Sequence, residues 1–216
     1  MKIQILISKN SWATNFEKQI KNNLKKFSKK IIFNNNHKKI RKNFDINIIF
    51  SYFKKIPKNY LNKSKFNLIP HESALPKGKG MSPLTWQVIN GNKFIIFSLI
   101  EATSKIDSGE IYFQKKVQID KTKIFKEIKD IQFKTNISLI LKFLNYYKKF
   151  KKKPKSKSQN GKSTFYKTRR PSDSKININK SLVSQLNLLR ACDFQNYPAF
   201  FVFKNTKFLL KLDKSK

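Results

Sequence analysis

One histidine and one aspartate have the residue types and the spacing to do chemistry together. His71 precedes a Leu-Pro corner, and Asp107 lies 36 residues later in an Asp-Ser-Gly turn. An imidazole titrates near neutral pH, so it can exchange a proton with a reacting group, and the turn that carries Asp107 could fold back on it. The same pattern also fits a structural histidine at a strand end, and both interpretations stay open at this point.

The segment that carries both residues differs from the rest of the chain. Residues 67–111 hold four of the five glycines, and a Leu-Pro-Lys-Gly-Lys-Gly corner at 75–80 closely follows His71. Such a corner brings backbone close to another group. The remainder is mostly Lys, Asn, Ile and Phe in amphipathic runs. We therefore expect the chemistry to lie within 67–111.

Metal chemistry is not expected. The second histidine, His37, lies in the polar stretch 34–39, where we expect an exposed side chain. Two well-separated histidines and one cysteine, Cys192, do not supply the ligand set of a zinc site. The single cysteine also excludes an intramolecular disulfide and is typical of a reducing cytoplasm.

Apolar runs and helix signals predict the elements that position His71. Strands are expected over 2–8, 31–33, 46–53 and 66–71, with helices over 14–27 and 57–64. This order predicts a mostly parallel sheet with helices on its faces. His71 then lies at the carboxyl end of a parallel strand, where open α/β sheets build their sites.

The second half of the chain predicts return strands and a small appended module. A helix can start at Ser82-Pro83 and stop at Asn90-Gly91. Strands over 93–102 and 110–119 and a long helix over 121–147 would complete a catalytic domain of residues 1–147. Residues 148–163 are basic and almost free of apolar side chains, which favours a solvated linker over a nucleic-acid-binding tail. Residues 164–216 are predicted to form a small α+β module with a helix and a hairpin.

The net charge of +36 is attributed mainly to composition. Of the 48 basic residues only four are arginine, the residue that grips phosphates bidentately, and the lysines are spread along the whole chain. High Lys, Asn, Ile and Phe together are what an AT-rich genome encodes. A positive field also draws anionic substrates inward, so the charge alone does not choose between nucleic acid and a small anion.

The chain is expected to be cytoplasmic and not bound in a membrane. The first residues, MKIQILIS, form too short an apolar run for a signal peptide. No stretch reaches the roughly 18 apolar residues that a membrane span needs.

The residues around His71 and Asp107 follow a known pattern. HESALPKGKGMSPLTWQVING and KIDSGEIYFQ resemble the N10-formyltetrahydrofolate-dependent formyltransferases, whose pattern is Asn-x-His-x-Ser-x-Leu-Pro, a glycine-rich corner, Pro-x-x-Trp and Asp-x-Gly-[Asp/Glu]-Ile. The separation of His71 and Asp107 matches the pattern. The tail, FYKTRRPSDSKININKS and LLRACDFQNYPAFF, is similar to the C-terminal region of the tRNA and sugar enzymes. The resemblance implies a Rossmann-like formyltransferase fold with a small C-terminal extension.

The resemblance also implies roles for particular residues. His71 would accept the proton of a primary amine that attacks a formyl group, and Asp107 would hold the ring or pass a proton through water. The donor would be N10-formyltetrahydrofolate, used as a co-substrate without a metal. The loop that lines the folate site in the family corresponds to Ser73, Ala74, Leu75 and Pro76.

One position departs from the family pattern. The family's asparagine, which helps to hold the oxyanion, falls at Ile69 in this chain, and the nearest asparagine is Asn67. Residues 67, 69 and 71 share a strand face, but two residues span roughly 6.6 Å. Asn67 would therefore join the catalytic set only if the backbone bulges near Pro70; otherwise it is a polar residue of the strand.

Three interpretations of the acceptor are kept. The short chain and the sequence of residues 72–87 favour the amine of a nucleotide-linked amino sugar as the acceptor. Trp12 would then stack on a base or sugar, unless it is a core residue. Methionyl-tRNA is the alternative, supported by the positive charge. The third is a catalytically impaired ligand-binding homologue, because of Ile69. The oligomeric state is open, with a homodimer among the alternatives.

Overall fold

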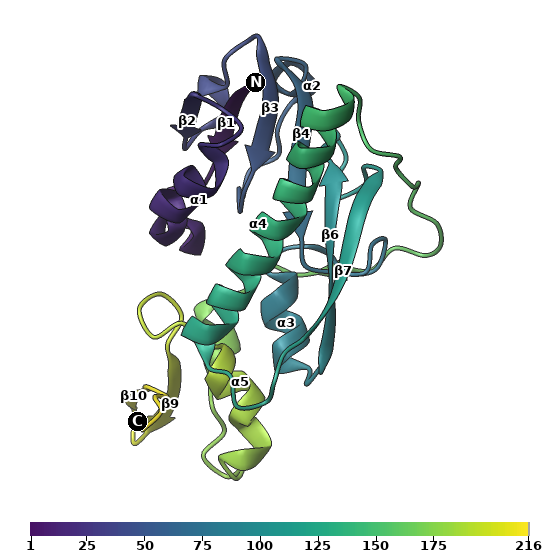
Figure 1. Ribbon diagram of the computed structural model, residues 1–216. Helices are drawn as coiled ribbons and strands as arrows, with labels where there is room; N and C mark the ends of the chain where they lie inside the picture. Colours follow the sequence, from purple (N-terminus) through teal and green to yellow (C-terminus); the bar gives the residue numbers. More distant parts are fainter. Residues whose placement is uncertain (216) are drawn as a thin grey trace.

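A six-stranded sheet forms the centre of the computed structural model, which describes residues 1–215. The strand order is β2-β1-β3-β4-β6-β7 (Figure 1). The strands are β1 (Lys2–Leu6), β2 (Lys30–Asn34), β3 (Phe44–Ile49), β4 (Ser64–His71), β6 (Phe94–Glu101) and β7 (Ile111–Gln118). The first four pair in parallel, whereas β6 runs antiparallel to β4 and β7 antiparallel to β6. The expectation of a mostly parallel α/β sheet is confirmed.

One face of the sheet is covered by α4 (Phe125–Phe150) and α1 (Glu17–Leu24), preceded by η1 (Trp12–Phe16). Figure 1 shows α4 crossing this face obliquely along its whole length. Apolar residues of α4 recur every three or four positions, which gives the helix one core-facing stripe. Phe143 is fully buried on this stripe, with ring centroids 5.5 Å from Phe66 and 4.8 Å from Tyr112. This packing fixes β4 and β7 against the helix.

The opposite face is covered by shorter elements. The single turn α2 (Lys58–Leu61) packs Leu61 against an apolar cluster that includes Leu6 and Ile49. The 3-10 turn η2 (His37–Lys39) lies nearby, and the His37 Nδ1 is 2.9 Å from the Tyr52 hydroxyl. The expectation of a freely exposed His37 is therefore wrong, because Tyr52 and the ring of Tyr60 partly cover it. This face also carries the side chain of Ile69.

The helix that follows the glycine corner begins and ends as predicted. It is α3 (Pro83–Ile89), with Pro83 at its first position, where the missing N–H costs no hydrogen bond. Asn90 caps its C-terminus, and Gly91 follows with a φ of 77°. The corner itself includes the short strand β5 (Lys79–Gly80), which pairs in parallel with β8 (Phe165–Tyr166).

The C-terminal residues form a small module of helical turns and a hairpin. Its elements are η3 (Pro171–Ser174), η4 (Val183–Gln185), α5 (Leu186–Ala191), β9 (Ala199–Phe203) and β10 (Thr206–Leu210). Arg190 of α5 is 2% exposed and donates through Nη1 to the carbonyls of Asp120 and Lys123, which precede α4. This buried arginine joins the module to the first domain.

The linker after α4 has the mostly exposed side chains that its composition predicts, but its backbone is attached to the first domain. Lys157 forms a two-way backbone bridge with Ile111 at the start of β7, with N–O distances of 2.8 and 2.9 Å. Figure 1 shows the green chain leaving the end of α4 and passing beside β7 on its way to the C-terminal module. Because the backbone of Ile111 donates one of these bonds and accepts the other, the linker lies on the first domain.

Every helix within residues 1–215 is too short or too polar to cross a bilayer.

Candidate active site

His71 ends β4 with its ring held on one side. The side chain is buried, and Nε2 lies 2.9 Å from the carbonyl oxygen of Gly78. A carbonyl oxygen only accepts hydrogen bonds, so Nε2 carries the proton in the neutral ring. The free lone pair is then on Nδ1, which lies 3.8 Å from Oδ2 of Asp107. The structure therefore brings the two predicted partners together, with the basic nitrogen of His71 facing the carboxylate of Asp107.

Asp107 sits in a turn whose backbone is constrained from several sides. Its φ of 45° is in the left-handed region, and its Oδ2 accepts a hydrogen bond of 2.9 Å from the N–H of Gly80. Gly109 ends the turn where a Cβ would overlap the carbonyl oxygen of Glu101. Only glycine fits there without moving the backbone, so the Asp-Ser-Gly sequence is required by the close approach of β6.

The glycine corner closes the other side of the site. Gly80 has a φ of 95°, and a Cβ there would collide with the carbonyl of Tyr166. The corner therefore approaches β8 closely, as its sequence predicts. Lys79 is buried in it, and its Nζ donates to the Ser108 hydroxyl at 2.9 Å. One short segment thus contacts both His71 and the turn that carries Asp107.

The four residues predicted to line a folate site follow His71 directly. Leu75 is buried against Ile100 and Ile111, whereas Ala74 is exposed and Pro76 is half-buried. Ser73 is 2% exposed, and its Oγ has no hydrogen-bond partner within residues 1–215. A buried hydroxyl without a partner is costly, so this atom is available to a ligand that enters the loop.

Asn67 is not brought to His71. Its side chain accepts a hydrogen bond from Asn47 and donates one to the carbonyl of Leu61, both at 3.0 Å. Pairing between β4 and β6 stays in register from Leu68 to His71, so the strand does not bulge at Pro70. Four residues of extended strand span about 13 Å. The side chain on this face next to His71 is therefore Ile69, which contributes no hydrogen-bond donor.

Trp12 packs mainly as a core residue. Its ring centroid lies 5.6 Å from that of Phe16 and 5.8 Å from that of Phe50. The Lys129 Nζ lies 5.1 Å from the centre of the indole ring. The Trp12 side chain is half-buried. This placement favours the core interpretation over a free stacking platform.

The linker supplies a contact that sequence reasoning missed. Gln159 donates through Nε2 to the carbonyls of Asp107 and Gly109, both at 2.8 Å. Thr164 accepts from the N–H of Gly78 through Oγ1 at 2.8 Å and from that of Lys79 through its carbonyl at 2.9 Å. Both residues lie in polar, lysine-rich sequence without periodicity, so no local signal marks them.

A half-buried glutamate near the site makes stability depend on pH. The carboxylate of Glu101 accepts from the Asn67 N–H at 2.7 Å and from the Tyr112 hydroxyl at 2.8 Å. Burial raises the pKa of Glu101 above its ordinary 4.5, and these hydrogen bonds only partly oppose the shift. A raised folded-state pKa means that the charged form penalises folding; the penalty is complete above the folded pKa and absent below the unfolded one.

Replacing Glu101 with glutamine is therefore expected to raise the free energy of unfolding at pH 7 and to have little effect near pH 4.5. Urea unfolding of the wild type and the variant across this pH range measures the difference. Glu17→Gln, on the exposed face of α1, is the control and should show no such pH-dependent gain. A benefit of Glu101→Gln that is equal at both pH values would contradict the expected linkage.

Fold and site together define an α/β protein with a histidine–aspartate pair at the carboxyl end of a parallel strand. The formyl transferase family model matches residues 13–142. The chain therefore belongs to the formyl transferase family. The matched region lies within the first domain and includes both His71 and Asp107.

Curated relatives match part of their own length. The chain is 29% identical over 157 residues to the methionyl-tRNA formyltransferase of Malacoplasma penetrans, which covers 70% of this chain and 47% of that protein. It is 35% identical over 149 residues to the bifunctional polymyxin resistance protein ArnA of Wigglesworthia glossinidia brevipalpis, covering 67% of this chain and 22% of that one. The chain spans about half the length of the methionyl-tRNA formyltransferases it matches.

Solved structures share the fold over nearly the whole chain. A methionyl-tRNA formyltransferase from Clostridium thermocellum has a TM-score of 0.80 at 20% identity, covering 100% of this chain and 94% of that one. A sugar N-formyltransferase from Shewanella has a TM-score of 0.70 at 18% identity, covering 100% of this chain and 99% of that one. At such identities the likeness shows the fold alone.

Proposed function

We propose that this chain transfers the formyl group of N10-formyltetrahydrofolate to a primary amine. The observation that carries the proposal is the pairing of the His71 Nδ1 with the Asp107 carboxylate, 3.8 Å apart, beside the loop that follows β4. The buried Ser73 hydroxyl and the exposed Ala74 belong to this loop. Ser73, Ala74, Leu75 and Pro76 are proposed to line the folate site.

The reaction uses His71 as a base. The amine nitrogen forms a bond to the formyl carbon, the carbonyl oxygen becomes an oxyanion, and the amine proton moves to Nδ1. The ring is then an imidazolium beside the Asp107 carboxylate, an opposite charge that stabilises it. The intermediate collapses by breaking the bond to N10 of the folate, which takes a proton as it leaves. His71 can supply that proton and return to its neutral state.

A nucleotide-linked amino sugar is the acceptor that we propose. The chain accounts for 98% and 99% of the solved chains of a 4-N formyltransferase from Francisella tularensis and of the Shewanella sugar N-formyltransferase. This likeness in fold over nearly the whole of both solved chains supports a sugar-type acceptor. A positively charged chain also favours an acceptor that carries phosphates.

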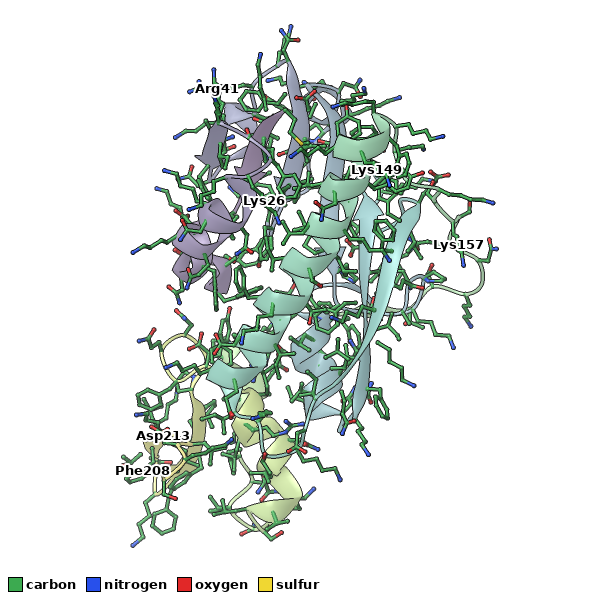
Figure 2. All side chains as sticks on the ribbon, viewed as in Figure 1. Lys26, Arg41, Lys149, Lys157, Phe208 and Asp213 are labelled. Atoms are coloured by element: carbon green, nitrogen blue, oxygen red, sulfur yellow. The ribbon has the colours of Figure 1, made fainter. Side chains whose placement is uncertain are left out.

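Methionyl-tRNA is the second candidate, favoured by the names of the curated relatives. The charge gives it weaker support, because basic side chains are scattered over the molecule. Figure 2 labels four of them in separate parts of the molecule: Lys26 after α1, Arg41 before β3, Lys149 in α4 and Lys157 in the linker. A third interpretation, a homologue that binds ligand but turns over poorly, rests on Ile69.

The test is a screen of nucleotide amino sugars and methionyl-tRNA with N10-formyltetrahydrofolate, read by the mass gain of one formyl group. Formylation of an amino sugar and not of methionyl-tRNA is the expected result, and the reverse would replace the proposed acceptor. Binding of the folate without formylation of either class would overturn the proposal of an active transferase. tRNA binding that disappears at physiological salt would be the ordinary response of a polycation.

A further inference from the structure

Residues 156–166 form a strap across the back of the catalytic turn. The strap begins with Ser156, whose hydroxyl donates to Glu110 at 2.6 Å, and with the backbone bridge between Lys157 and Ile111. It ends at β8, which pairs with β5 in the glycine corner. It therefore contacts the two segments that hold Asp107 and His71.

Gln159 is the strap residue that contacts the catalytic turn most specifically. Its Nε2 has two hydrogens, and the carbonyls of Asp107 and Gly109 each accept one of them. These carbonyls lie on either side of Ser108, so one amide group fixes the width of the turn. The side chain is half-buried, which keeps water from competing freely for the same carbonyls.

The turn needs such support because its conformation is unfavourable by itself. Asp107 is a non-glycine residue with a φ of 45°, a left-handed backbone state that is less favourable than the usual ones and is held here by its surroundings. From the front, the Gly80 N–H holds the carboxylate. From the back, Gln159 holds the backbone. Loss of the rear contact would let the carboxylate move away from His71.

We propose that Gln159 is a positioning residue that holds Asp107 at its distance from His71. The inference rests on the proposed function for its kinetic consequence, although the geometry itself does not require a known substrate. Gln159 does not contact the reacting atoms; it acts only through the Asp107 turn.

The chain offers a direct readout of this geometry. It contains only two histidines, so the ring resonances of His71 and His37 can be assigned with one variant of each. The carboxylate of Asp107 lies opposite Nδ1 of His71. Moving this charge away changes the electric field at the ring, so the chemical shifts of the His71 ring should change.

The test variants are Gln159→Ala and Gln159→Met, the second of which keeps the length and loses both N–H groups. Asn160→Ala is the matched control, since Asn160 is the next residue, is exposed, and uses its amide in no hydrogen bond within residues 1–215. The NMR spectrum of each purified full-length variant is recorded at one pH, and its melting temperature is checked. In both Gln159 variants the His71 ring resonances should move, while the His37 resonances stay in place. In Asn160→Ala neither should move.

The kinetic readout is separate. Once an acceptor has been identified, both Gln159 variants should lose about 10- to 100-fold in kcat at nearly unchanged KM for the folate. This is the usual penalty for a small misplacement of a catalytic group, here Asp107. A folded Gln159→Met protein whose His71 ring resonances match those of the wild type would overturn the inference. Should no acceptor be formylated by the wild type, the proposed function fails, while the NMR comparison still decides whether Gln159 positions Asp107.

Discussion

Replacing His71 with alanine is expected to lower kcat/KM for formyl transfer by about 10²–10⁴-fold, the range that a positioned acid–base group contributes. The Nδ1 of His71 is the only imidazole nitrogen that faces Asp107, and its Nε2 is occupied by the Gly78 carbonyl. Removing the ring leaves the attacking amine without its proton acceptor. Initial rates with N10-formyltetrahydrofolate and the acceptor identified by mass gain measure the loss.

Two controls give this loss its meaning. His37→Ala removes the other imidazole. Its Nδ1 contacts the Tyr52 hydroxyl, which is not a predicted site residue, so this variant should retain the wild-type rate. Folate affinity, followed by tryptophan fluorescence, should change little in His71→Ala, because the loss concerns a proton transfer and not binding. A His71→Ala protein with a near-wild-type rate would refute the assignment of the base.

The position of His71 could be predicted because local signals agree with the fold there. The apolar run of β4 ends at His71, and Pro83 and Gly91 bound the next helix where the sequence indicates. These features depend on neighbours within a few residues. Both have local causes that can be recognised in the sequence: the apolar pattern of a strand and the missing N–H of proline.

The contacts of Asn67 and Gln159 could not be predicted, because they depend on residues far away in the sequence. Whether Asn67 turns toward His71 depends on Asn47 and Leu61, which reach it across β3 and α2. Whether Gln159 is solvated depends on two carbonyls about 50 residues earlier in the chain. A buried polar group binds whichever partner the tertiary structure brings near, and composition carries no information about that partner.

Replacing Ile69 with asparagine is expected to raise kcat by about 10²–10³-fold, the effect of one oxyanion donor. Ile69 lies two residues before His71 on the same strand face, and its side chain packs against Leu75 and Ile100. Asparagine is somewhat smaller, so it fits the position and places an amide where the family pattern has one. Initial rates of the wild type, Ile69→Asn and Ile69→Val measure the gain, and only the asparagine variant should show it.

The gain in kcat should be accompanied by a loss of thermal stability, because both come from the new amide group. A half-buried amide among these apolar side chains destabilises the fold by up to about 1–3 kcal/mol, so Ile69→Asn should melt at a lower temperature than Ile69→Val. In the double variant with His71→Ala the gain should vanish, because without a base to take the amine proton the tetrahedral intermediate returns to the amine and the formyl donor. A faster Ile69→Asn enzyme would show that the site is otherwise complete and that isoleucine limits turnover. An unchanged rate would mean that the oxyanion is held by another donor.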